Sequence, residues 1–140
     1  MPTPTTQFVR ISTATQEAIA DAEAAYRHQT SLIPADLMLK LIQNGKRRDE
    51  AGYDPPPLLK LFCPWSVGTW LLVDADPDEP GRLFGLCDVG EPELGYVSLD
   101  EIEELRGPGG LRIERDLFFT ATKPLSVYAE EARTKGRIDA

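Results

Sequence analysis

The chain is poor in the residues that most often carry catalysis and metal binding. Its 140 residues include one histidine, His28, and two cysteines, Cys63 and Cys87. Structural zinc sites take four ligands at characteristic spacings, and neither cysteine belongs to a CxxC pair. Asp88 follows Cys87 directly, and a neighbouring negative charge disfavours a reactive thiolate. We therefore expect reduced, partly buried thiols, no metal site of this kind and no cofactor.

Other signatures of enzymes and membrane proteins are also missing. The sequence has no nucleophile beside a base and no glycine-rich phosphate loop. No apolar run approaches the about 18 residues that suggest a membrane helix. The first residues lack the basic and then apolar pattern of a secretory signal. We expect a cytoplasmic protein, and the sequence nominates no catalytic residue.

Negative charge is concentrated in the middle of the chain. The net charge is -8, and residues 61–110 alone carry 11 acidic and 2 basic side chains. Such a surface repels phosphates, so nucleic-acid binding through it is unfavourable, whereas a basic protein partner would be attracted. The basic loop Lys46-Arg47-Arg48 and the basic tail leave nucleic-acid binding elsewhere as a third alternative.

The pattern of apolar residues predicts an α+β domain. Hydrophobic residues make up 41% of the chain, which is enough for one ordered core. Short turns separate successive apolar runs, which favours an antiparallel meander of four or five strands. The predicted strands are 58–62, 69–73, 82–87 and 94–97, followed by a less regular segment at 111–119. We expect helices to cover one face of this sheet, at about 34–43, 99–106 and 124–135.

Residues 1–30 are expected to form an extension to a compact domain at 31–140. The extension contains a predicted helix at about 14–28 whose apolar stripe is thin and rich in alanine. A weakly amphipathic helix of this kind needs a neighbour to pack against. A homodimer formed through this helix is therefore one predicted partnership.

Aromatic residues beside the predicted turns are the first candidates for a binding surface. Trp65 lies in the turn before the second strand, and tryptophan and tyrosine are enriched at binding hot spots. Trp70 continues into an apolar run and is expected in the core. Gly95 permits close approach of another backbone or a bulge, and Tyr96 beside it offers an aromatic face with a polar tip. Trp65 and Tyr96 are therefore the predicted anchors.

The triplet Glu114-Arg115-Asp116 stands out directly before an apolar run. An arginine in this setting can hold a carboxylate or phosphate of a ligand through two hydrogen bonds. Alternatively, Arg115 pairs internally with Glu93 or Asp88 and fixes a loop. Both interpretations stay open at the level of the sequence.

Two acidic turns are the remaining candidates. The first holds four carboxylates and the second three, namely Asp74, Asp76, Asp78 and Glu79, then Asp88, Glu91 and Glu93. Carboxylates gathered at one end of a sheet could hold Mg²⁺ or Ca²⁺. In an antiparallel meander, however, successive turns lie at opposite ends. Solvated charge is therefore the default interpretation, and we predict a charged binding surface and no metal.

Several motifs occur together in one order along the chain. They are Pro64-Trp65, Thr69-Trp70, Phe84-Gly85-Leu86, Glu93 to Gly107, Gly110 to Phe119 and Lys123 to Ser126. Together they resemble the bacterial domain-of-unknown-function family numbered 2958, over roughly Leu32 to Ile138. The resemblance implies a small protein of the kind carried by plasmids, integrative elements and phages. It supplies no activity and no catalytic residues.

These observations lead to a ranked set of functional hypotheses. The first is a non-enzymatic protein-binding module of a mobile genetic element, which contacts a host or element-encoded protein through its acidic surface. A variant is an acidic mimic of DNA that acts in the conflict between host and element. The alternative from another class is a small hydrolase or nucleotide-handling enzyme that uses carboxylates and Arg115 with a divalent metal.

Overall fold

In the computed structural model, residues 12–18 and 32–140 are described. The chain divides into two compact units, Met1–Ser31 and Leu32–Ala140. Among the described residues, no helix has the length and apolar character needed to cross a membrane.

In the first unit, residues 13–18 are helical. The helix begins after Ser12, whose hydroxyl accepts a hydrogen bond from the backbone N–H of Thr15 at 3.2 Å. This is a capping interaction at the helix N-terminus. Most of the helix predicted at 14–28 lies outside the described residues, so the homodimer through it stays a prediction.

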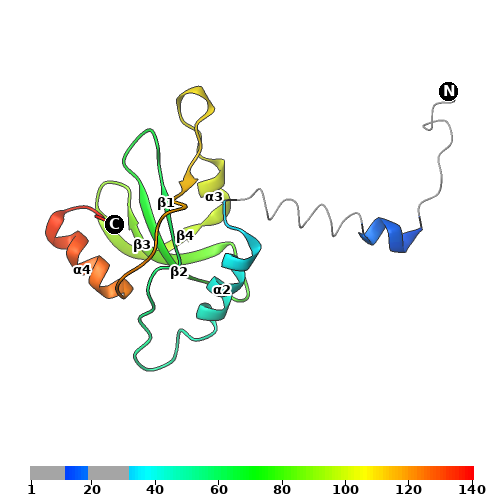
Figure 1. Cartoon of the computed structure of the whole chain (residues 1–140), viewed down its shortest axis with the longest axis horizontal. Coiled ribbons are helices and arrows are strands. Elements are labelled where there is room, and N and C mark those ends of the chain that lie inside the picture. Colours follow the sequence, from blue (N-terminus) through cyan, green and yellow to red (C-terminus); the bar gives the residue numbers. More distant parts are fainter. Residues whose placement is uncertain (1–11, 19–31) are drawn as a thin grey trace. The chain divides into compact units, whose positions relative to one another are not determined.

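The second unit is built on a five-stranded antiparallel sheet (Figure 1). The order of strands across the sheet is β4-β3-β2-β1-β5. The strands are β1 (Leu59–Phe62), β2 (Thr69–Ala75), β3 (Arg82–Asp88), β4 (Pro92–Ser98) and β5 (Glu114–Arg115). The predicted meander is confirmed for the first four strands. The fifth strand has only two residues, so one edge of the sheet is very short.

Helices pack on both faces of the sheet. They are α2 (Ala35–Gly45), α3 (Leu99–Glu104) and α4 (Leu125–Lys135), with a 3-10 turn η2 at Pro108–Gly110. Trp70 and Leu72 of β2 pack in one hydrophobic cluster with residues of α2 and α3. Leu71 and Val73 pack in a second cluster with residues of α4. In Figure 1, α2 and α4 lie on different sides of the sheet.

The predicted α+β class is therefore confirmed, but the prediction that all helices cover one face is wrong for α4. Side chains alternate between the two faces of a strand, and β2 is apolar on both. A strand of this kind needs cover on each side. The continuous apolar run of β2 was the sequence signal for a second covered face.

A bulge in β2 decides where Asp74 lies. The pairing of β2 with β3 shifts between Leu72 and Asp74, so that Asp74 stands opposite Phe84. The extra residue places Asp74 on the face of the sheet that α4 covers. A bulge at Gly95 was one of the sequence-based alternatives, but the pairing of β3 with β4 is continuous there.

Helix α3 starts directly from the end of β4. The Ser98 hydroxyl accepts a hydrogen bond from the backbone N–H of Glu101 at 3.4 Å, so Ser98 caps the helix. No loop separates strand and helix. The acidic first turn of α3, with Asp100 and Glu101, is thereby held beside the edge of the sheet.

Candidate functional site

The two edges of the sheet differ in length and exposure. The β5 edge has two residues, whereas the β4 edge has seven. Within the described part of the chain, β4 pairs with β3 alone. Leu94 and Tyr96 of β4 are large side chains with 47% and 43% of their surface exposed. A long exposed edge with apolar side chains is a template for another strand.

The hydrogen bonds show which backbone groups of β4 point outward. The N–H of Leu99 donates to the carbonyl of Gly81 at 2.8 Å, and the carbonyl of Arg82 accepts from Asp76 on the β2 side at 2.9 Å. Arg82 pairs with Ser98, and these two bonds mean that the backbone groups of Arg82 and Ser98 do not bond to each other. Along an antiparallel ladder, residue pairs without mutual hydrogen bonds alternate with hydrogen-bonded pairs.

Applying this alternation to β4 separates its residues into two sets. The residues Glu93, Gly95 and Val97 direct their backbone groups at β3. The backbone groups of Leu94 and Tyr96 point away from the sheet. The free edge therefore offers N–H donors and carbonyl acceptors at two successive positions, in the spacing that an added strand requires.

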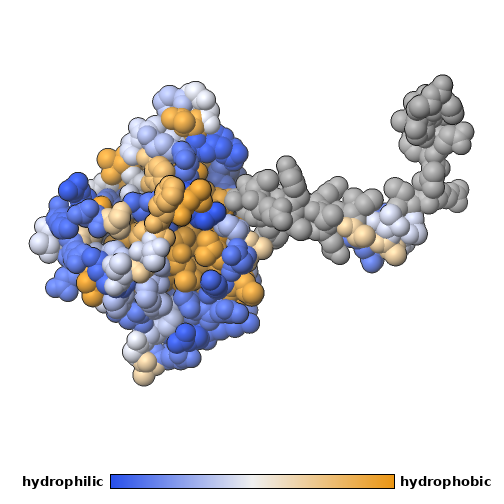
Figure 2. Space-filling model, in the orientation of Figure 1, coloured by the Kyte–Doolittle hydropathy of each residue, from blue (hydrophilic) through white to orange (hydrophobic). Residues whose placement is uncertain are grey.

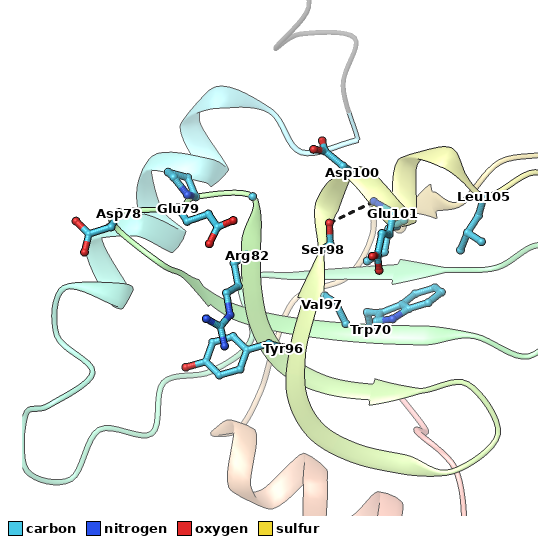
Figure 3. Close-up of a pocket in the computed structure, with 13 residues that line it drawn as sticks. Trp70, Asp78, Glu79, Arg82, Tyr96, Val97, Ser98, Asp100, Glu101 and Leu105 are labelled. Carbon is cyan, nitrogen blue, oxygen red and sulfur yellow. Dashed lines mark hydrogen bonds between the residues drawn. The ribbon is translucent and has the colours of Figure 1, made fainter.

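A groove of 850 Å³ runs beside the end of this edge (Figure 3). Trp70, Val97 and Leu105 contribute apolar side chains to its lining. Four carboxylates line it, from the β2–β3 turn and the start of α3, namely Asp78, Glu79, Asp100 and Glu101. Among the described residues that line the groove, Arg82 is the one with a basic side chain. The groove is therefore open, acidic at its walls and partly apolar.

Tyr96 is held by aromatic and cationic neighbours. The guanidinium of Arg82 lies 4.1 Å from the centre of the Tyr96 ring, as the stacked pair in Figure 3 shows. The guanidinium of Arg48 lies 5.0 Å from the same ring and donates a hydrogen bond to its hydroxyl. Phe84 meets the ring edge-on, with centroids 5.0 Å apart. These contacts fix an exposed aromatic side chain in place.

Arg48 is in turn anchored by a buried carboxylate. Asp74 is 1% exposed, and its Oδ2 lies 3.4 Å from Nε of Arg48. The hydroxyl of Tyr53 donates to the same oxygen at 2.7 Å. Oδ1 of Asp74 has no hydrogen-bond partner among the described residues. Burial raises the pKa of Asp74, although Tyr53 and Arg48 act to lower it; burial also raises the pKa of Tyr53.

The network of Asp74, Tyr53 and Arg48 was missed by the sequence analysis. The sequence predicts Asp74 in a solvated acidic turn, but β2 extends through this residue and the bulge buries it. Its position directly after an apolar run was the available signal. The arginine and the tyrosine come from the loop after α2, and the sequence gives no means of pairing that loop with β2.

The predicted residues of the second acidic turn have different roles. Asp88 is 4% exposed. Its two oxygens accept hydrogen bonds from the backbone N–H groups of Gly90 and Ile138, each at 3.0 Å. Asp88 therefore ties the turn to the C-terminal segment and adds nothing to the exposed surface. Glu91 and Glu93 are exposed, as the surface hypothesis requires.

The triplet Glu114-Arg115-Asp116 lies at the opposite edge of the sheet, because β5 pairs with β1. Arg115 donates through Nε to the carbonyl of Leu32 at 3.2 Å, so the predicted pairing with an acidic residue of the β3–β4 turn is wrong. Asp116 accepts from the N–H of Phe118 at 2.9 Å and lies 3.7 Å from Lys60. Glu114 is exposed. The triplet does not join Tyr96 in one site.

Trp65 packs against the hydrophobic core. The side chain is half-buried and packs against the cluster that contains Trp70, which is buried as predicted. A Cβ added at Gly107 would lie 2.3 Å from the Trp65 ring. The glycine therefore lets the chain after α3 run directly over the indole. Of the two predicted anchors, Tyr96 is the more exposed and lies on the free edge.

Metal binding and thiol chemistry gain no support from the described residues. They contain no group of three or more histidine, cysteine, aspartate or glutamate side chains that could hold a metal ion. The two acidic turns lie at opposite ends of β3, as the meander predicts. Burial raises the pKa of Cys87 to about 11, which keeps this thiol protonated.

Exposed hydrophobic residues also occur outside this edge. Figure 2 shows hydrophobic residues gathered in the middle of one face of the domain, with hydrophilic residues around them. The most exposed large apolar side chains are Leu117 at 71% and Phe118 at 95%. They lie in a turn held by Asp116.

Comparison with known proteins places the chain in a family. A family model described as Protein of unknown function (DUF2958) matches residues 32–139, which is most of the chain. The chain belongs to the DUF2958 family. No curated protein and no solved structure matches it. The match covers the sheet, all three described helices of the second unit and the β4 edge, and the DUF2958 description assigns none of them a role.

Proposed function

We propose that this DUF2958 protein is a non-enzymatic protein-binding module that adds an extended segment of a partner, with basic residues in it, to the free edge of β4. The partner is a protein encoded by the host or by the element that carries the gene. The observation that carries the proposal is the seven-residue strand β4, which among the described residues pairs on one side only, with Leu94 and Tyr96 exposed and Tyr96 beside an acidic groove.

Backbone geometry supports strand addition. The outward N–H and carbonyl groups of Leu94 and Tyr96 can pair with an extended segment without disturbing the ladder to β3. In known modes of peptide recognition, such main-chain bonds supply affinity and pockets for alternate side chains supply specificity. Tyr96 is fixed by its arginine neighbours, so little side-chain entropy is lost on binding.

Charge supports a basic partner. The groove presents four carboxylates and one arginine, and Glu91 and Glu93 lie exposed at the far end of the same edge. Complementary charge speeds encounter and selects among partners. Phosphate-rich ligands are repelled by this surface, which is why we place a protein segment there and not a nucleic acid.

The proposal is tested by capture from lysate with matched variants. Leu94→Pro removes one outward N–H and leaves the hydrogen bonds to β3 intact, because proline is tolerated on edge strands. Glu101→Lys reverses one charge in the groove, and Glu104→Lys makes the same change on α3 outside the groove lining. We expect the wild type and Glu104→Lys to retain the same partner, and Leu94→Pro and Glu101→Lys to lose it.

Two further outcomes of the capture experiment test the proposal. Partners retained equally by folded Leu94→Pro would refute strand addition at β4. The DNA-mimic variant requires in addition that DNA displaces the captured protein, and displacement by DNA is therefore measured in the same experiment.

A second candidate, a carboxylate- and arginine-dependent enzyme, is favoured by one observation. A buried carboxyl with a raised pKa beside a charged partner is typical of functional sites, and Asp74 beside Arg48 meets that description. A hydrolase or nucleotide screen with divalent metals tests it. Activity that Asp74→Asn abolishes, with partner capture unchanged, would establish this function in place of the first.

A further inference from the structure

The free edge of β4 has two chemically different sides. Side chains alternate along a strand, so an added segment also directs alternate side chains to the two sides. On one side lies α3, which packs with Val97 against the first cluster. On the other lies α4, which packs with Leu86 of β3, the residue opposite Leu94. Each side of β4 therefore contacts every second side chain of the partner segment.

The α3 side is acidic. Val97 and Glu93 share this side because they are separated by four positions in a strand. Glu101 projects from α3 into the groove on the same side, toward Trp70 in Figure 3. Asp100 adjoins it. Basic side chains of an added segment on this side would meet two to three carboxylates, those of Glu93, Asp100 and Glu101.

The α4 side carries cations. Arg82 and Tyr96 share it, and Arg48 contacts the Tyr96 ring. Arg82 and Tyr96 also line the groove, together with the carboxylates of Asp78 and Glu79. Arg133 of α4 lines a smaller hollow of 320 Å³ with Leu94. Glu93 also reaches the rim of that hollow, and the charge of Arg48 is offset in part by Asp74.

Arg82 and Arg133 form no salt bridge with the described residues. An acidic side chain of the partner is the complementary group for both, since guanidinium and carboxylate form charge-assisted hydrogen bonds. A basic side chain at the same position would face the positive charges of Arg82 and Arg133.

We infer that the segment bound along β4 alternates in charge, with basic residues on the α3 side and acidic residues on the α4 side. This inference rests on the proposed strand addition and specifies its partner. Alternation distinguishes the segment from a simple basic tail, because a run of lysines would satisfy one side and be repelled by the other.

Selection from a displayed library of random seven-residue segments, the length of β4, tests the inference with the full chain as bait. We expect enriched segments to alternate basic and acidic residues. Two synthetic peptides of equal composition then give a direct comparison. In the first peptide, single lysines alternate with single glutamates, and in the second, pairs of lysines alternate with pairs of glutamates. As a strand, only the first peptide places its lysines on one side and its glutamates on the other. The first should bind at least about tenfold more tightly, the ratio expected from a few exposed charge pairs.

A charge reversal on the protein provides the specificity control. Arg82→Glu should shift the enriched residue at the facing position from acidic to basic. Lys40→Glu changes the net charge equally on an exposed part of α2 and should leave the preference unchanged. Equal binding of the two peptides, or an unchanged preference in Arg82→Glu, would overturn the inference.

The outcomes separate this inference from the proposed function. If no segment is enriched, or if enriched segments bind Leu94→Pro as well as the wild type, strand addition itself fails. If segments bind, are lost in Leu94→Pro and show no alternation, strand addition stands and the charge pattern is refuted.

Discussion

Replacing Tyr53 by phenylalanine removes one of the two groups that stabilise the buried Asp74 carboxyl. The Tyr53 hydroxyl donates to Oδ2 at 2.7 Å, and Oδ1 already lacks a partner among the described residues. A net hydrogen bond to a buried or charged group contributes about 1–3 kcal/mol. We therefore expect Tyr53→Phe to lower the free energy of unfolding by about 1–3 kcal/mol.

Urea unfolding followed by tryptophan fluorescence measures this change. Tyr96→Phe is the matched control, because it removes the same atom from a half-exposed ring that Arg48 contacts at the surface. Its cost should stay below about 0.5 kcal/mol, as for other exposed polar contacts. Equal costs for the two variants, or a loss below about 0.5 kcal/mol for Tyr53→Phe, would refute the buried network as the anchor of Arg48.

The same network predicts a pH dependence with a definite sign. Burial raises the pKa of Asp74 in the folded protein, so the folded state holds this proton more tightly than the unfolded state. The contribution of Asp74 to stability is complete below the unfolded carboxyl pKa of about 3.9 and is lost as pH rises through the raised folded value. The stability of wild type relative to Asp74→Asn should therefore fall as pH rises from about 4 toward neutrality.

Tyr53→Phe should extend this loss to higher pH. The Tyr53 hydrogen bond acts against burial and lowers the pKa of Asp74, so its removal raises that pKa further. A stability difference between wild type and Asp74→Asn that rises with pH would contradict the assignment.

Three substitutions test contacts that position the edge and its supports. Gly85→Ala places a Cβ 2.0 Å from the backbone carbonyl oxygen of Leu71, so we expect the free energy of unfolding in urea to fall by more than about 3 kcal/mol. A fall below about 1 kcal/mol would show that β2 and β3 can separate there. Gly107→Ala forces the Trp65 ring aside, so it should shift the tryptophan emission and lower the free energy of unfolding by about 1–3 kcal/mol. An unchanged emission spectrum would argue against the close packing of Gly107 on Trp65. Asp88→Ala frees the N–H of residue 138, whose amide hydrogen exchange should accelerate; unchanged exchange would remove the proposed link to the C-terminal segment.

The sequence predicts the strands of this fold well because their signals are local. Four apolar runs separated by short turns give the order and direction of β1 to β4. Burial of Trp70 follows from its place in an apolar run. These features depend on residues close together in the chain, which is why propensity and spacing suffice.

The site is predicted less well because it depends on contacts across the chain. Tyr96 was identified from its residue type, but its neighbour Arg48 comes from a loop 48 positions earlier. One interpretation of the sequence pairs Arg115 with Glu93 or Asp88, whereas strand order places Arg115 at the opposite edge of the sheet. The sequence predicts surface charge at Asp88, but its carboxylate accepts hydrogen bonds from two backbone N–H groups. Strand order and register, which local patterns do not specify, decide all three.

Residue-resolved amide hydrogen exchange of β4, with and without a captured partner or a selected peptide, tests the central claim most directly. In the free protein, we expect fast exchange at Leu94 and Tyr96 and slow exchange at Gly95 and Val97, whose N–H groups point at β3. In the complex, the amides of Leu94 and Tyr96 should become slow as well. If those two amides still exchange rapidly when the protein is saturated, the partner does not add a strand to β4.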